Sequence, residues 1–154
     1  MRGIEFRALL KLDDGSLRDV GTATAVNPDE LIDQIEARRD EGRINITDRS
    51  EVWIIPVDSF IRRLSVPTKD VSKEDDPDGY EFAYSSEEDR RFGDTYVALS
   101  QISDDDYIVD GYVRALEFET ACRVAASLKG GRMDAKPVVL VPEDTLNRYT
   151  VEPN

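Results

Sequence analysis

Apolar and β-branched residues near the N-terminus fall into two short stretches, 3–12 and 17–26, around Asp13-Asp14-Gly15. An acidic-glycine turn between two such stretches predicts a β-hairpin. Asn27 and Pro28 then supply a helix N-cap and a first helical residue, and Glu30 is placed to complete a capping box. This helix is predicted to end at Gly42.

The continuous apolar run 52–55 follows this helix and predicts a strand covered on both faces. A second series has the same pattern. Residues 96–102 and 107–115 flank a polar turn over 103–106, apolar residues recur at helical spacing from 118 to 128 before Lys129-Gly130-Gly131, and 138–141 is another apolar run. Both series therefore predict the order strand, strand, helix, strand.

Direct comparison of the two series indicates a repeat. Residues 6–26 (FRALLKLDDGSLRDVGTATAV) align without gaps to 96–116 (YVALSQISDDDYIVDGYVRAL), and residues 52–63 (VWIIPVDSFIRR) align to 138–149 (VVLVPEDTLNRY). The sequence thus predicts an α+β fold made of two pseudo-symmetric ββαβ units, an internal duplication packed as one compact domain with both helices on one side. Each unit ends in Pro-x-Asp-[Ser/Thr], where Asp58 and Asp144 are expected to cap a short turn or to pair with Arg62 and Arg148.

These patterns divide the chain into a first repeat at 1–66, an acidic linker or insertion at 67–94 and a second repeat at 95–154. The middle region holds 10 acidic and four basic residues. Its first part, 67–79, has the composition of a linker or mobile loop. Tyr80, Phe82 and Tyr84 alternate with other residues, which predicts an extra strand, and 86–91 predicts one helical turn.

Composition restricts the chemistry. No apolar run approaches the ~20 residues that cross a membrane, and the N-terminus has no secretory leader pattern. A single cysteine, Cys122, excludes an internal disulfide and favours a reducing, cytoplasmic compartment; its place on the predicted helix favours a core role. The chain has no histidine, which excludes Ser-His and Cys-His dyads and His-ligated zinc. No catalytic residue, cofactor or metal ligand is predicted, and the acidic runs at 74–79 and 104–106 do not match a Ca²⁺-binding loop.

The net charge is −13, from 33 acidic and 20 basic residues. Such a field repels nucleic acid, which argues against direct nucleic-acid binding and favours a basic protein partner. Two simpler explanations of the acidity remain. Acidic surfaces keep proteins soluble, and the chain could be adapted to high salt, since 15 of its 20 basic residues are arginine.

Two functions follow as hypotheses. In the first, the chain is a non-enzymatic acidic protein that binds a basic, nucleic-acid-handling partner. Such binding could also inhibit the partner, by analogy with phage anti-defence inhibitors and immunity proteins. Its contact residues would be Tyr80, Phe82, Tyr84, Glu87, Glu88 and Asp89. In the alternative, the chain is a small-molecule-binding or catalytic pseudo-dimer whose site lies at the junction of the two repeats.

Overall fold

The computed structural model describes residues 3–42, 50–75, 80–128 and 134–152. The elements of the predicted first repeat, residues 1–66, are β1 (Ile4–Lys11), β2 (Leu17–Ala25), α1 (Pro28–Asp40), β3 (Glu51–Pro56), the 3-10 turn η1 (Val57–Ser59) and β4 (Ile61–Ser65). The middle region forms β5 (Ser72–Asp75), β6 (Glu81–Tyr84) and the short helix α2 (Glu87–Phe92). The second repeat forms β7 (Asp94–Gln101), β8 (Asp106–Ala115), α3 (Phe118–Leu128), β9 (Lys136–Pro142), η2 (Glu143–Thr145) and β10 (Asn147–Thr150).

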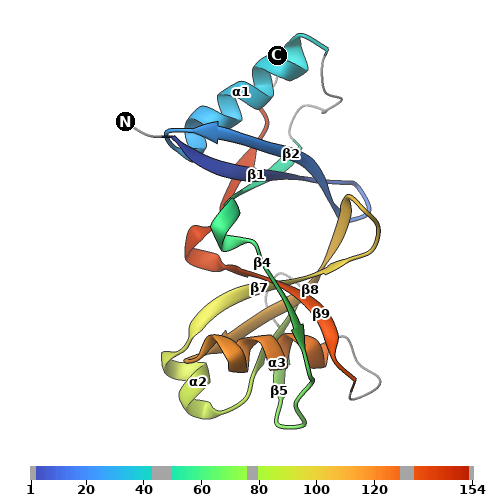
Figure 1. Cartoon of the computed structure of the whole chain (residues 1–154), viewed down its shortest axis with the longest axis vertical. Helices are drawn as coiled ribbons and strands as arrows, with labels where there is room; N and C mark the ends of the chain where they lie inside the picture. The colour runs from blue at the N-terminus through green and yellow to red at the C-terminus, as the bar shows by residue number, and fades with distance from the viewer. Residues whose placement is uncertain (1–2, 43–49, 76–79, 129–133, 153–154) are drawn as a thin grey trace.

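All ten strands of the described chain belong to one sheet, so the protein is a compact α+β domain. The main path of the sheet is β10-β3-β1-β2-β8-β7-β9-β4. These neighbours pair antiparallel, whereas β6 pairs parallel with β8 and antiparallel with β5. Helix α1 lies at one end of the molecule, and α2 and α3 lie near the other (Figure 1). The prediction that the helices of both repeats lie on one side is therefore wrong, because α1 and α3 cover separate core clusters.

Strand register is the same in the two repeats. Ala8 pairs with Gly21 and Leu9 with Asp19, so the ladder slips by one residue between them. The slip recurs in the second repeat at Ala98, which pairs with Gly111. These pairings place the aligned sequence blocks at equivalent positions of the sheet.

The two repeats exchange their last strands. Strand β4 follows β3 in the chain but pairs with β9, and β10 follows β9 but pairs with β3. The register is again matched, because Ile61 lies opposite Leu140 and Asn147 opposite Ile54. Each repeat therefore contains a strand that the other one contributes.

Alternation along the strands divides the core into three clusters. One face of each repeat packs under its own helix, with Phe6, Ala8 and Ile54 below α1 and the equivalent Tyr96, Ala98 and Leu140 below α3. The opposite face is shared. It contains Leu9, Trp53 and Ile55 of the first repeat together with Val97, Leu99, Val139 and Val141 of the second.

Several local predictions are confirmed. Asn27 caps α1 by accepting the Glu30 N–H at 2.9 Å, and Gly42 follows the helix with a positive φ of 72°. The Glu30 carboxylate reaches the Val26 N–H, one residue before the one expected for a capping box. Cys122 is buried in the α3 cluster, and this burial raises the pKa of its thiol. Gly130 and Gly131 lie outside the described residues.

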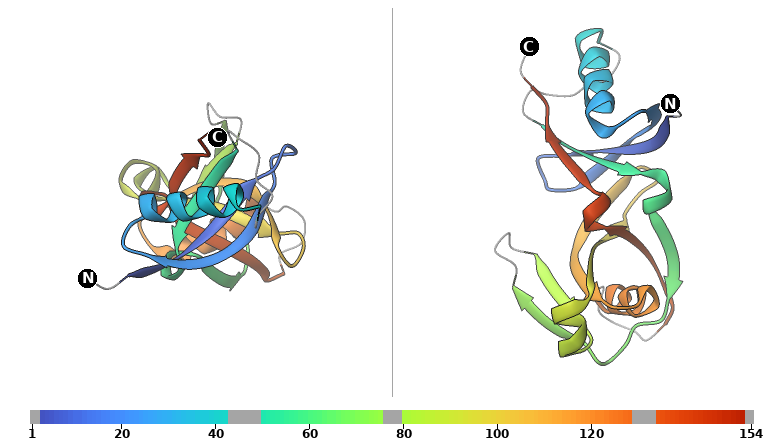
Figure 2. Two further views of the ribbon diagram at one scale, coloured as in Figure 1. Left: turned by 90° about the horizontal axis from the view of Figure 1, so that it is seen from above. Right: turned by 90° about the vertical axis from the view of Figure 1, so that its left-hand side faces the viewer.

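Other local predictions are corrected. Residues 72–75 of the predicted linker form β5, which pairs with β6, while 76–79 lie outside the described residues (Figure 2). Neither 3-10 turn has a side-chain cap from Asp58 or Asp144. Arg62 lies on extended strand β4 and bonds the side chains of Gln101 and Tyr107. An i, i+4 ion pair needs helical geometry, which these segments do not have.

Gly21 and Gly111 occupy equivalent positions beside the two slips, with φ of 109° and 151°. This backbone region favours glycine because other residues have a Cβ that is strained there. Their surroundings differ. A Cβ on Gly111 would lie 2.6 Å from the Glu81 carbonyl oxygen of the chain entering β6, whereas a Cβ on Gly21 would meet nothing within 4 Å.

This difference predicts unequal effects of the same substitution. Gly21→Ala introduces backbone strain alone, which costs about 1 kcal/mol. Gly111→Ala adds a clash with β6, and we expect it to lower the free energy of unfolding by a further ~1–3 kcal/mol. Urea denaturation of the two variants beside the wild type measures both values. Equal losses would contradict close packing of β6 on Gly111.

Candidate functional site

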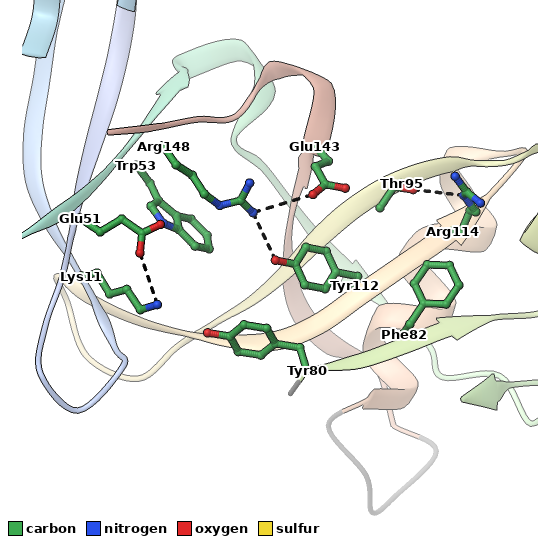
Figure 3. A pocket seen from close by; sticks show the side chains of 10 residues that line it. All are labelled: Lys11, Glu51, Trp53, Tyr80, Phe82, Thr95, Tyr112, Arg114, Glu143 and Arg148. Carbon is green, nitrogen blue, oxygen red and sulfur yellow. Dashed lines mark hydrogen bonds and ion pairs between the residues drawn. The ribbon is translucent and has the colours of Figure 1, made fainter. Parts of the chain in front are cut away.

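A cleft of about 600 Å³ lies at the junction of the two repeats. Its wall is formed by Lys11, Glu51, Trp53, Tyr80, Phe82, Thr95, Tyr112, Arg114, Glu143 and Arg148 (Figure 3). The first repeat contributes β1 and β3, the second contributes β7, β8, η2 and β10, and the middle region contributes Tyr80 and β6. The strand exchange brings these segments together, because it places β10 beside β3.

Trp53 anchors one side of the cleft. It is only 3% exposed, and its indole N–H donates to Glu51 at 3.1 Å. The Arg148 guanidinium lies over the indole, 4.9 Å from the ring centroid, in a cation–π contact. Lys11 approaches the other oxygen of Glu51 at 3.4 Å. The first-repeat side of the cleft is thus preorganised by linked contacts.

Arg148 also connects this side to the opposite one. Its guanidinium donates to the Tyr112 hydroxyl at 3.2 Å and lies 3.9 Å from the Glu143 carboxylate. Tyr80 meets Tyr112 edge-on, with ring centroids 5.9 Å apart. Figure 3 shows Tyr80 and Phe82 side by side along the lower wall. The middle region therefore completes the aromatic lining.

Arg114 stands apart from the other two cations of the cleft. Its guanidinium donates to the Thr95 hydroxyl at 3.1 Å and to the Arg90 carbonyl at 2.8 Å, and it lies 6.0 Å from the Phe82 ring centroid. These partners are neutral. Among the described residues, no carboxylate forms an ion pair with Arg114, although Asp94, Glu143 and Asp144 line a neighbouring hollow together with it.

The charge of the cleft differs from that of the whole chain. Lys11, Arg114 and Arg148 outnumber the carboxylates Glu51 and Glu143 in its wall. The chain as a whole carries 33 acidic and 20 basic residues. A cleft with more cations than carboxylates and with aromatic rings in its wall suits an anionic ligand better than a cationic one.

A smaller hollow occupies the equivalent place in the other repeat. Its wall includes Arg62, Gln101, Pro137 and Val139, which align with Arg148, Lys11, Glu51 and Trp53. Only the arginine is retained between the two. Neither Tyr80 nor Phe82 lines this second hollow, so among the described residues the aromatic lining belongs to the junction cleft alone.

The predicted contact residues separate into different environments. Tyr80 and Phe82 line the cleft, whereas Tyr84 is buried and donates to Glu74 at 2.7 Å, which raises the pKa of its phenol. The aromatic faces of Phe82 and Tyr84 already carry the chain's own Arg114 and Arg90. One face of each ring is therefore already occupied by an arginine of the same chain.

The three predicted carboxylates also differ. Glu87 and Glu88 are exposed, and Glu87 pairs with Arg90 and Arg91 at 3.3 and 3.2 Å. Asp89 is buried at the start of α2, where its carboxylate accepts the Leu116 N–H at 3.0 Å. It joins the helix to the end of β8. The structure does not gather these carboxylates and the three aromatics into one surface.

Trp53, Tyr112, Arg114 and Arg148 were missed as site residues. Trp53 had the sequence signal of a core residue, and Arg148 that of a local ion pair. Their meeting depends on pairing between β3 and β10, which no local pattern encodes. One signal was present in the sequence: the repeat alignment places Trp53 against Val139 and Glu51 against Pro137, which marks side chains that the common fold does not require.

Within the described parts of the chain, no cluster of three or more His, Cys, Asp or Glu side chains is placed to hold a metal ion. None of the helices in those parts is long and apolar enough to cross a membrane. Comparison with protein-family models, curated proteins and solved structures gives no match to this chain. The assignment of a function therefore depends on the chemistry of the cleft and of the surface.

The position of Asp89 generates a stability prediction. Asp89→Ala removes the buried carboxylate that accepts the Leu116 N–H, and we expect the free energy of unfolding to fall by about 1–3 kcal/mol. Glu88→Ala, the exposed neighbour on the same helix, should change it by less than about 0.5 kcal/mol. Urea denaturation of both variants makes the comparison, and equal values would show that the Asp89 contact contributes nothing.

Proposed function

We propose that the protein binds a small organic anion with a planar ring in the cleft at the junction of the repeats. The observation that carries this proposal is Arg114, a cation held in place by neutral partners and facing an aromatic wall. A bound carboxylate or phosphate would supply the counter-charge that the described chain does not, through charge-assisted hydrogen bonds.

The aromatic side chains support the second part of the ligand's description. Tyr80 and Phe82 are half-buried and line the cleft beside Arg114. A planar ring packed on these side chains would bury apolar surface from both molecules and gain favourable ring–ring geometry. Positioned polar groups on an aromatic wall are typical of small-molecule sites. The proposed activity is binding.

An origin by internal duplication is consistent with this asymmetric site. The two repeats share element order, register, both slips and the reciprocal strand exchange. We propose that a duplicated unit first formed two equivalent hollows. One then acquired tryptophan, lysine and glutamate, together with the aromatics of the inserted segment, while the other has Val139, Gln101 and Pro137 at these positions.

The only tryptophan of the chain lies in this cleft, so binding can be followed without a label. We expect adenosine 5′-monophosphate or 4-hydroxybenzoate, each a ring with an anionic group, to change Trp53 fluorescence saturably. The uncharged analogues adenosine and 4-hydroxybenzamide should bind more weakly. Arg114→Gln keeps hydrogen-bond donors but removes the charge, and should weaken binding of the anion by about tenfold or more.

Arg62→Gln is the matched control, because Arg62 lines the equivalent hollow of the other repeat. It should leave binding of the anions unchanged. Thermal unfolding of both variants checks that the fold is kept. The proposal is overturned if neither anion binds below ~10 mM, if the uncharged analogues bind as well, or if the two arginine variants lose affinity equally.

A second candidate function is binding of a basic protein partner by the acidic surface. The pairing of β2 with β8 brings the two hairpin turns together. Asp13, Asp14, Asp104 and Asp105 are all exposed there, with Arg18 and Asp106 paired between the turns. Exposed Glu87 and Glu88 lie elsewhere, on α2. Such a surface would speed encounter with a cationic partner and would lose this effect in salt.

This second function predicts capture of a basic protein from an extract of the protein's own cells, retained at low salt and released at high salt. Glu87→Gln with Glu88→Gln should slow its association while leaving the fold intact, because both carboxylates are exposed. Asp13→Asn with Asp14→Asn is the matched comparison. If the turn variant slows association as much or more, the carboxylates of α2 do not form the main contact. If the captured partner is neutral or acidic, the hypothesis of a basic partner is wrong.

A further inference from the structure

In the described part of the chain, the outer edge of β2 has no partner strand at the positions where the equivalent edge of β8 pairs with β6. Residues Phe82–Tyr84 of β6 pair in parallel with Tyr112–Arg114 of β8. The equivalent β2 residues are Thr22–Thr24, which pair with β1 on one side. On the other side, no strand of the described chain lies beside them, since β2 meets β8 only at Leu17 and Arg18.

The space beside this edge is open. A Cβ on Gly21 would have no neighbour within 4 Å, whereas at Gly111 the same space holds the Glu81 carbonyl. A narrow groove runs between the β2 edge and α1, with Ala8, Val20, Ala23, Leu31 and Ile35 in its wall. In the second repeat the equivalent place is filled, because Ala83 of β6 packs there against Ala121 and Ala125 of α3.

The groove sets the chemistry of what it can accept. Its free volume is about 20 Å³, which leaves room for no more than a methyl-sized side chain. Arg38 lies at its rim, one turn beyond Ile35, and forms no ion pair or hydrogen bond with the described residues. In the second repeat this position is Leu128. The groove therefore combines a small apolar hollow with an arginine that has no ionic partner in the described part of the chain.

We propose that the outer edge of β2 binds an extended segment of another protein, added parallel to β2 as β6 is added to β8. Side chains two residues apart in a strand point to the same side. If a small residue of the added segment occupies the groove, the residue two positions before it lies near Gly21 and Arg38. We expect this earlier residue to be acidic, because it faces the charge of Arg38. The recognition pattern is acidic–any–small, which β6 itself carries as Glu81, Phe82 and Ala83.

Strand addition uses main-chain hydrogen bonds for affinity and side-chain pockets for selection. A second copy of this chain is a poor occupant, because two molecules with net charges of −13 repel each other. A short acidic segment carries fewer charges than a whole chain, so it is repelled less, and it gains the contact with Arg38. This inference does not depend on the ligand of the junction cleft.

The probe is a synthetic peptide with the sequence of residues 80–86, added to ¹⁵N-labelled full-length protein. We expect saturable shifts of the backbone amide signals of residues 20–24 and none confined to the cleft around Trp53 and Arg114. A peptide with tryptophan in place of its alanine should not bind, because the groove cannot hold a large side chain. No saturable binding below ~1 mM, or shifts located at the cleft, would overturn the proposal.

A charge exchange tests the role of Arg38. Arg38→Glu should weaken binding of the peptide by roughly five- to tenfold. A peptide with lysine in place of its glutamate should bind the wild type weakly and recover affinity for the Arg38→Glu variant. Arg123→Glu, an exposed arginine of α3, is the control and should change nothing. Loss of binding without recovery by the exchanged pair would contradict the predicted contact.

Discussion

Each repeat of this protein lacks a strand that only the other can provide. Without β10 the outer edge of β3 is unpaired, and without β4 the same is true of β9. The shared cluster adds a second constraint, because Leu9 and Trp53 of one repeat pack in it with Leu99 and Val139 of the other. One repeat alone would expose both a hydrogen-bonding edge and an apolar face to water. The fold therefore forms as a whole.

The same exchange creates the junction cleft and makes it rigid. Arg148 reaches Trp53 because β10 belongs to the sheet of the first repeat, and reaches Tyr112 because its own repeat lies opposite. The cleft wall thus lies largely on strands. The inserted segment adds Tyr80 and Phe82 to one side only. Two halves with matched strand register can in this way carry side chains at their junction that the other side of the sheet does not repeat.

Local structure was predictable wherever neighbouring residues determine it. The turn at Asp14 and the cap at Asn27 both depend on contacts within four residues. Strand β5 was mistaken for a linker because its four residues are all polar and exposed, and it forms by pairing with the edge of β6. The site was the least predictable part. Its residues come from seven separate segments, and their distances depend on the register of strands far apart in the sequence.

The exchanged strands also bear on how the chain is made. The ribosome produces β3 long before β10, since the middle region and almost all of the second repeat lie between them. During that interval the apolar run Val52–Ile55 has an unpaired edge. Synthesis of the last strand is therefore the step that completes the first repeat. A nascent chain stopped anywhere before Asn147 carries an open edge that invites pairing with other chains.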